Sequence, residues 1–224
     1  MELRLREFRP RIGPHEHRVV QPGRPLRHTS LRDPSALAPY GMLVGDHDGL
    51  SRLAGLFSFA AFSRHTIVHV PLRDCVPSVE GCGELVDLVL AHPEAGLRPS
   101  KWPELRRALR RDTPLTARTD ETRTERHARA WLERPYDRRL LRHTAHARTY
   151  FLIGGRDAFA SAATSFAYAA DQGPRQKGVL KGRLMYMDSV GGEPAPHGDG
   201  SHDPEVLICF KEYPTDAHLK RPGH

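Results

Sequence analysis

Cysteine, lysine and long apolar runs are scarce in this sequence, and each scarcity argues against a class of protein. The 224 residues include only 3 Cys, an odd number that disfavours a disulfide-stapled fold and indicates reduced, structural thiols at Cys75, Cys82 and Cys209. No stretch reaches the ~18 consecutive apolar residues that a membrane-spanning helix needs. Because the segment Met1–Arg6 is charged where a secretory leader is apolar, we expect a cytoplasmic protein with no membrane segment.

Basic residues are abundant, and almost all of them are arginine. The chain has 29 Arg and 5 Lys against 27 Asp and Glu, which leaves a net charge of +7. Residues 98–148 contain 15 Arg or Lys and 7 Asp or Glu, a net charge of +8, so the rest of the chain is close to neutral. A concentrated basic segment suits nucleic acid or an acidic partner. Codon drift in a GC-rich genome produces an arginine bias as well.

Composition and length favour one α/β domain. With 38% hydrophobic and 27% charged residues, the chain can bury one sizeable core. We expect an Arg- and Pro-rich N-terminal arm or edge segment over residues 1–38, a single domain over 39–217 and a polar tail over 218–224. The expected domain has a mixed sheet with packed helices, in the order βαβ, a basic helical insert at about 98–148, then βαββ. The α+β class is the alternative.

The periodicity of apolar residues places the elements of that domain. Residues 41–45 predict a buried strand, 50–62 a helix and 66–72 a strand parallel to the first. Helices are predicted over the Leu- and Val-rich run 83–91, from Lys101 onward with Leu105 and Leu109 inside, and over 121–133. The last third predicts a strand at 148–153, a glycine turn, a helix at 157–170 and antiparallel strands at 179–187 and 205–213.

Two acidic groups carry the clearest chemical signal. Asp46 and Asp48 follow the strand 41–45, at the carboxyl end where α/β proteins bind ligands, and two such carboxylates can share a hard cation such as Mg²⁺. Asp199 and Asp203 lie in the loop between the last two strands. These fragments resemble the first and last motifs of haloacid-dehalogenase-type phosphohydrolases. The resemblance implies that Asp46 is a nucleophile, Asp48 an acid–base group, Asp199 and Asp203 metal ligands, and Lys181 the charge-stabilising lysine.

Other interpretations of these residues stay open. The chain departs from the family pattern at Leu50, where the family has Thr, and residues 193–197 cannot form the buried strand that precedes the last motif. Asp46 and Asp48 also suit capping of the helix that follows them, without catalysis. The loop between the last strands holds five polar side chains that either wrap a divalent ion or face solvent, namely His197, Asp199, His202, Asp203 and Glu205.

Two weaker signals concern a glycine turn and a histidine. The turn at Gly154–Gly155 opens a helix whose backbone N–H groups can receive a phosphate, but Asp157 at the helix start would repel an anion. A purely structural turn is therefore the other interpretation. His69 lies in a predicted strand, where it is either a base or ligand or simply packed and hydrogen-bonded.

Two function hypotheses of different class fit these patterns. The first is a divalent-metal-dependent enzyme, with Mg²⁺ as its expected cofactor, that acts on a phosphate-bearing small molecule through Asp46 and Asp48. The second is a basic protein that binds nucleic acid or an acidic partner through arginines of the 98–148 segment, chiefly Arg106, Arg107, Arg110 and Arg111. A solvated arginine-rich face explains the same residues without a ligand, and whether the protein is an enzyme stays open.

Overall fold

The computed structural model describes residues 1–33, 40–74, 83–134, 141–179, 183–191 and 205–212. These stretches contain the helices α1 (His47–Ala61), α2 (Trp102–Arg107), α3 (Glu121–Leu132) and α4 (Arg156–Gln172), and the 3-10 helices η1 (Pro93–Ala95), η2 (Pro99–Lys101) and η4 (Gly173–Arg175). Their strands are β1 (Glu2–Phe8), β2 (Arg11–Ile12), β3 (His15–Glu16), β4 (Arg18–Pro22), β5 (Ser30–Arg32), β6 (Gly41–Gly45), β7 (Thr66–Val70), β8 (Leu85–Ala91), β9 (Asp112–Arg118), β10 (Leu141–His146), β11 (Thr149–Gly154), β12 (Met185–Val190) and β13 (Val206–Phe210). None of the described helices is both long enough and apolar enough to cross a membrane.

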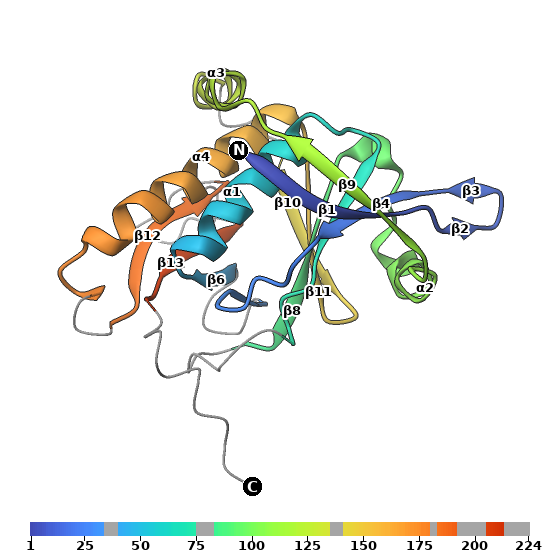
Figure 1. Ribbon diagram of the computed structural model, residues 1–224, viewed down its shortest axis with the longest axis horizontal. Helices are drawn as coiled ribbons and strands as arrows, with labels where there is room; N and C mark the ends of the chain where they lie inside the picture. The colour runs from blue at the N-terminus through green and yellow to red at the C-terminus, as the bar shows by residue number, and fades with distance from the viewer. Residues whose placement is uncertain (34–39, 75–82, 135–140, 180–182, 192–204, 213–224) are drawn as a thin grey trace, which may run out of the picture.

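Eleven of the described strands form one mixed sheet. Seven of them follow the order β10-β11-β8-β7-β4-β1-β9, in which β8 runs parallel to β11 and β4 runs parallel to β7. The other four, in the order β12-β13-β6-β5, join the seven where Leu31 of β5 pairs with Val86 of β8. The strands β2 and β3 form a separate hairpin that projects from the sheet (Figure 1). The expected α/β fold with a mixed sheet and packed helices is confirmed.

Two helices cover one face of this sheet, and a third packs against them. Helices α1 and α4 lie side by side on it, and α3 packs against α4 (Figure 1). Phe57 of α1 meets Phe166 of α4 with ring centroids 4.8 Å apart, at the centre of the main hydrophobic core. Strand residues complete that core, including Leu3, Val20, Leu43, Leu88, Leu152 and Ile208.

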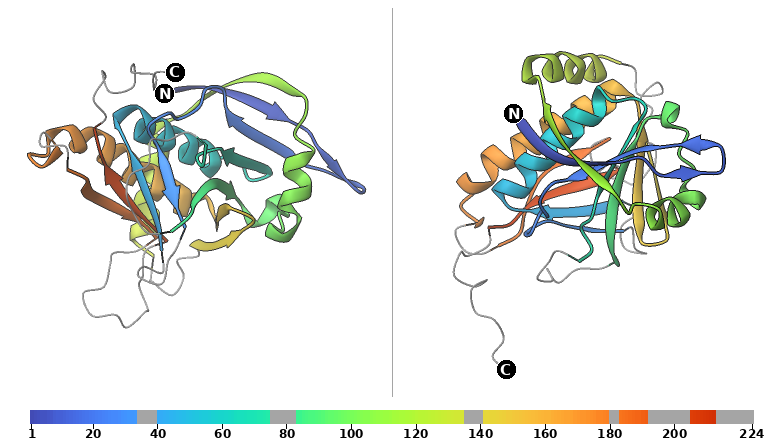
Figure 2. Two further views of the ribbon diagram at one scale, coloured as in Figure 1. Left: turned by 90° about the horizontal axis from the view of Figure 1, so that it is seen from below. Right: turned by 45° about the vertical axis from the view of Figure 1, so that its right-hand side comes forward.

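Helix α2 covers the opposite face, as the turned views of Figure 2 show. Successive side chains of a strand point to opposite faces, so Leu88 and Leu90 of β8 enter the main core while Val89 enters a second cluster. In that second cluster Trp102 and Leu105 of α2 pack against Val89 and Phe151. The two apolar clusters therefore fix α2 and α3 on different sides of the sheet.

Most elements predicted from apolar periodicity are present, and one is wrong. The strand at 41–45, the helix that follows it, the helix at 121–133 and the strand–turn–helix that begins near residue 148 correspond to β6, α1, α3 and β11–α4. Residues 83–91 do not form a helix, because Leu85–Ala91 is the strand β8. Its apolar run reflects a strand that is buried on both faces, where strict alternation of polar and apolar residues disappears.

The expected pairing around α1 is also wrong. We expected β6 and β7 to be parallel neighbours, but β5 and β8 lie between them in the sheet. Because β6 pairs antiparallel with β5, β5 with β8 and β8 with β7, the strands β6 and β7 run in opposite directions. The last two strands, β12 and β13, do form the expected antiparallel pair.

Two segments, expected from the sequence to be an N-terminal arm or edge segment and a helical insert, contribute strands to the main sheet. Residues 1–38 include β1, which lies between β4 and β9, and Leu3 and Leu5 of β1 enter the main core. Residues 98–148 add β9 and β10 to the sheet in addition to α2 and α3. The tail at 218–224 lies outside the described residues.

Candidate functional site

A pocket lies where the parallel strands β8 and β11 end and helix α4 begins. Strand β11 ends at Gly154, Gly155 is the N-cap residue of α4, and β8 ends at Ala91, one residue before His92. The carboxyl ends of neighbouring parallel strands open at one edge of the sheet, where α/β proteins commonly bind ligands. We call the space at this edge the α4 pocket; its volume is about 690 Å³.

The first turn of α4 presents backbone donors to this pocket. Gly155 has no side chain with which to cap the helix, and the first backbone bond of α4 runs from the Phe159 N–H to the Gly155 carbonyl. The N–H groups of Arg156, Asp157 and Ala158 therefore lack an intrahelical acceptor, and all three residues line the pocket. Helix α4 has 17 residues, so its dipole adds partial positive charge at this end.

Two arginines bring full positive charge to the same pocket. Arg142 lies on β10 opposite Ile153 of β11, and its exposed side chain lines the pocket. Arg156 is the first residue of α4, and its guanidinium lies 5.9 Å from the ring centroid of Phe62. The Nε atom of Arg156 is buried and has no hydrogen-bond acceptor among the described residues. Neither arginine forms an ion pair with a carboxylate in the described part of the chain.

The carboxylate that was expected to repel an anion here is neutralised. Asp157 Oδ1 accepts a hydrogen bond of 2.8 Å from His127 Nδ1, and Asp157 Oδ2 is paired with Arg134 of the segment after α3. His127 and Arg134 precede Asp157 by 30 and 23 residues. They lie beside it because α3 packs on α4. The objection that Asp157 raises against an anion at the Gly154–Gly155 turn is therefore removed by contacts that local sequence does not show.

One further carboxylate, that of Glu94, also lines the pocket. Glu94 belongs to η1, and a hydrogen bond with its own backbone amide lowers the pKa of that carboxyl group. His92 precedes it, is 6% exposed, donates from Nε2 to the Ala60 carbonyl at 3.0 Å and places Nδ1 3.6 Å from Glu94. Burial lowers the pKa of His92, so the ring is neutral at neutral pH. The lining of the pocket thus combines cationic groups with a carboxylate that accepts hydrogen bonds.

The acidic residues proposed for magnesium are only partly placed by the structure. Asp46 is the N-cap residue of α1, and its Oδ1 accepts a hydrogen bond of 2.9 Å from the Gly49 N–H. Asp48 is exposed and lies 3.6 Å from Arg52, one helical turn later. Within the described residues no group of three His, Cys, Asp or Glu side chains is arranged to hold a metal ion. Capping by Asp46 is therefore observed, and the magnesium site stays a prediction.

Several predicted site residues lie outside the described residues. They are Lys181, Asp199 and Asp203, together with His197 and His202 of the same loop and the cysteines Cys75 and Cys82. Cys209 is described, and burial raises the pKa of its thiol to about 11. That value agrees with a structural thiol, because the nucleophilic thiolate is then absent at neutral pH.

The four arginines proposed to contact phosphate occupy different settings. Arg106 lies 3.5 Å from the buried carboxylate of Asp87, and Arg107 donates from Nε to the Pro103 carbonyl at 3.1 Å. Arg110 and Arg111 are exposed between α2 and β9. Since α2 and α3 lie on opposite faces of the sheet, the arginines of these two helices do not share one surface.

A row of hydrogen-bonded polar side chains crosses the α2 face of the sheet, and only a weak sign of it is visible in the sequence. Arg6 donates to Gln21 Oε1 at 2.9 Å, which leaves Gln21 Nε2 as the donor to His69 Nδ1 at 2.7 Å. This pattern assigns the His69 proton to Nε2, which faces Asp87 Oδ2 at 3.5 Å. The last separation is long for a hydrogen bond, so the contact is chiefly electrostatic.

Asp87 is the last residue of this row of polar side chains, and donors surround its carboxylate on several sides. Its Oδ1 accepts hydrogen bonds from the N–H groups of Leu72 and Arg73, and its Oδ2 lies 3.5 Å from the guanidinium groups of Arg73 and Arg106. Burial alone would raise the pKa of Asp87, but His69, Arg73 and the backbone donors outweigh it and lower the pKa. His69 and Asp87 are 3% and 2% exposed, so we assign this cluster a structural role. The sequence signal was a lone aspartate inside an apolar run.

The chain was compared with protein-family models, with curated proteins and with solved structures. None of the three comparisons found a match.

Proposed function

We propose that this protein binds a small organic phosphate in the α4 pocket. The observation that carries the proposal is the uncapped N-terminus of α4, which opens into the pocket beside Arg142 and Arg156. Backbone N–H groups and two guanidinium groups are the donors that line this region, and the helix dipole adds partial positive charge to it. A phosphate at such a position gains charge-assisted hydrogen bonds from both kinds of donor.

Phosphate suits this donor set better than a neutral ligand does. An anion would satisfy the N–H groups of Arg156, Asp157 and Ala158, which have no acceptor within α4. It would also compensate the two guanidinium groups that lack a carboxylate partner among the described residues. Asp157 does not oppose it, because Arg134 compensates the charge of its carboxylate and His127 contributes a hydrogen bond to it.

The size of the pocket favours an organic phosphate over the bare ion. A water molecule occupies about 30 Å³ in the liquid, so 690 Å³ exceeds the volume of an inorganic phosphate several-fold. Pro93, Trp131 and Ile153 add apolar surface to the lining, which suits a carbon skeleton. Glu94 also lines the pocket and accepts hydrogen bonds, which suits a hydroxyl-bearing ligand such as a sugar phosphate.

Isothermal titration calorimetry with a hexose phosphate tests this proposal. The proposal expects saturable binding of the hexose phosphate, weaker binding of inorganic phosphate and no binding of the free hexose. Arg142→Ala and Arg156→Ala should each weaken the affinity about tenfold or more, because each removes a charge-assisted hydrogen bond.

Arg129→Ala is the matched control, since Arg129 is an exposed arginine of α3 that does not line the pocket. Its affinity for the hexose phosphate should equal that of the unaltered protein. Equal losses of affinity in the Arg129, Arg142 and Arg156 variants would assign the binding to diffuse positive charge and overturn the proposed site. Binding of the free hexose with the same affinity would overturn the role of phosphate.

Magnesium-dependent chemistry at Asp46 and Asp48 is a separate proposal, with Asp199 and Asp203 as the further ligands. A thermal melt of chelator-stripped protein with added Mg²⁺ tests it. The proposal expects a saturable rise in melting temperature that Asp46→Asn abolishes. At a Mg²⁺ concentration a hundredfold above the dissociation constant, the free energy of unfolding should rise by about 2.7 kcal/mol. A flat response to Mg²⁺ in the unaltered protein would overturn it.

A further inference from the structure

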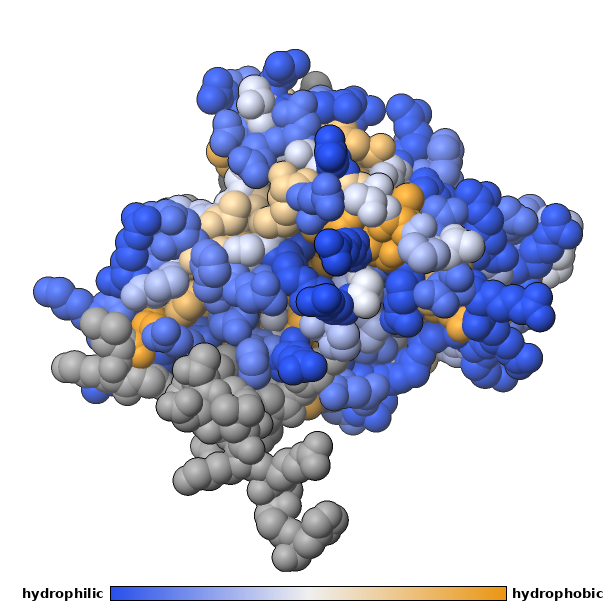
Figure 3. All heavy atoms as spheres, in the orientation of Figure 1, coloured by the Kyte–Doolittle hydropathy of each residue, from blue (hydrophilic) through white to orange (hydrophobic). Residues whose placement is uncertain are grey.

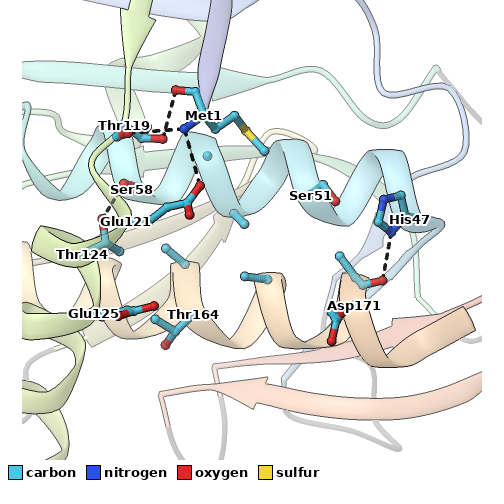
Figure 4. Close-up of a pocket in the computed structure, with 15 residues that line it drawn as sticks. Met1, His47, Ser51, Ser58, Thr119, Glu121, Thr124, Glu125, Thr164 and Asp171 are labelled. Carbon is cyan, nitrogen blue, oxygen red and sulfur yellow. Dashed lines mark hydrogen bonds and ion pairs between the residues drawn. The ribbon is translucent and has the colours of Figure 1, made fainter. Parts of the chain in front are cut away.

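A second, smaller pocket runs along the seam between α1 and α4, on the side of these helices that faces solvent (Figure 4). We call it the seam groove; its volume is about 250 Å³. Its floor consists of side chains too short to fill the space, including Ala54 and Gly55 of α1 and Ala163 and Ala167 of α4. Figure 3 shows a strip of apolar surface over this region, bordered by hydrophilic side chains.

The seam groove carries only negative side-chain charge. Glu121 and Glu125 of α3 lie at one end of it, and Asp171 lies at the other (Figure 4). Not one of the 15 residues that line it is Arg or Lys, although the whole chain has a net charge of +7. The Met1 amine is the one cationic group of the lining, against the three carboxylates of Glu121, Glu125 and Asp171. The groove is therefore complementary in charge to a cation, in contrast to the α4 pocket.

The carboxylates at its ends can accept a ligand. Glu125 is exposed and forms no ion pair with any described residue, while the Glu121 carboxylate lies 3.5 Å from the Met1 amine. Asp171 pairs with Arg175 one helical turn later, in an exposed contact of 2.9 Å that exchanges easily with a competing cation. Hydroxyl groups of Ser51 and Thr164 add acceptors along the walls.

The spacing of the two ends sets the length of the ligand. Thr164 lies beside Glu125 in Figure 4, and Asp171 follows it by seven residues along α4, which corresponds to about 10 Å of helix. A volume of 250 Å³ accommodates roughly eight water-sized groups. A ligand with cationic groups about 10 Å apart and a slender apolar middle satisfies both limits.

From this geometry we infer that the seam groove binds a linear aliphatic polyamine. Its terminal ammonium groups pair with Glu125 at one end and Asp171 at the other, and its methylene groups lie on the alanine and glycine floor. A compact dication such as Mg²⁺ has the charge but cannot span the groove. A monoamine has the apolar chain but meets only one end.

Calorimetric titration with spermidine tests the inference. Mg²⁺ serves as a probe that has the charge without the apolar chain, and propylamine as a probe that has only one ammonium group. The expected result is saturable binding of spermidine and at least tenfold weaker binding of both probes. Glu125→Gln and Asp171→Asn should each weaken spermidine binding about fivefold, as expected for the loss of one partly exposed ion pair. Ala167→Leu fills the groove and should abolish binding.

Glu133→Gln is the matched control, because Glu133 is an exposed carboxylate at the end of α3 that does not line the groove. Failure to bind spermidine, equal binding of Mg²⁺, or retention of binding in Ala167→Leu would each overturn the inference. Self-association that Ala167→Leu abolishes would also overturn it, since a second copy of the chain would then occupy the groove. The binding of hexose phosphate to Ala167→Leu should be unchanged, so the two proposed sites fail independently.

Discussion

Asp87 shows how a single buried charge organises one face of this protein. Its carboxylate receives two backbone N–H groups and faces His69, Arg73 and Arg106, which come from β7, the segment after β7 and α2. The Asp87 carboxylate compensates the positive charge of Arg73 and Arg106. Removal of its charge therefore leaves several donors unsatisfied. This asymmetry makes the cost of breaking the cluster larger than the net stability that the cluster provides.

Asp87→Asn should therefore lower the free energy of unfolding by about 3 kcal/mol, because it breaks a buried ion pair. Urea unfolding at neutral pH measures this change. Asp74→Asn is the control, since Asp74 is an exposed aspartate that also lies near Arg73, and its loss should stay below about 1 kcal/mol. Equal losses in the two variants would contradict the assignment of Asp87 as the centre of the cluster.

His92 makes the stability depend on pH. Its pKa is lowered in the folded state by burial, so acidification protonates the unfolded chain more readily than the folded one. The contribution of neutral His92 is complete above the ordinary histidine pKa of about 6.5 and declines as the pH falls below it.

His92→Gln should flatten the decline in unfolding free energy between about pH 7 and pH 5.5, by up to ~1.4 kcal/mol per pH unit. Urea titrations at several pH values, compared between the variant and the unaltered protein, measure the difference in slope. An identical slope in the His92 variant would show that its titration does not contribute.

At the scale of elements, the structure separates patterns that local sequence determines from those set by distant contacts. Helix α1 was predictable, because an aspartate cap precedes apolar residues at helical spacing. Strand β8 was not, because a strand covered on both faces has the same continuous apolar run as a buried helix. In the sequence the α4 pocket shows only as a glycine turn. Pairing of β10 with β11 brings Arg142 to the pocket, and Arg134, which follows α3, compensates the charge of Asp157.

The cap of α1 provides a test at this scale. Asp46→Ala should lower the free energy of unfolding by about 1 kcal/mol, whereas Asp46→Asn should cost much less, because asparagine also caps helices. Thermal or urea unfolding distinguishes the two. If Asp46→Asn were as destabilising as Asp46→Ala, the carboxylate charge would matter more than the hydrogen bond to Gly49.

At the scale of the whole molecule, the first strands belong to the main sheet, and the arginine-rich segment 98–148 is divided between the two sides of that sheet. Strands β1 and β4 separate β7 from β9, so residues 1–22 complete the core between α1 and the sheet. The arginines of α2 and α3 lie on opposite faces, which weakens the case for a single nucleic-acid surface over 98–148. Sequence alone could not show either arrangement, because both depend on strand order.

Removal of residues 1–22 should therefore prevent folding. The deletion takes Leu3, Leu5 and Val20 out of the core, at about 1.5–3 kcal/mol for each buried side chain, which approaches the whole stability of a typical domain. Circular dichroism during heating would show no cooperative transition. Replacement of residues 11–16 by a two-residue Asn-Gly turn is the control, since it shortens only the projecting β2–β3 hairpin and should retain the transition. A truncated protein with an unchanged melting temperature would contradict this account and support the interpretation of these residues as an arm outside the core.

The most direct test of the central claim is a nuclear magnetic resonance titration of the backbone amides with a hexose phosphate. Binding at the α4 pocket should move the amide signals of Gly155, Arg156, Asp157 and Ala158 most, because these N–H groups face the ligand. Those shifts should saturate at the affinity measured by calorimetry and disappear in Arg142→Ala at the same ligand concentration. Shifts spread over the arginines of α2 and α3, with none at the first turn of α4, would contradict the proposed site.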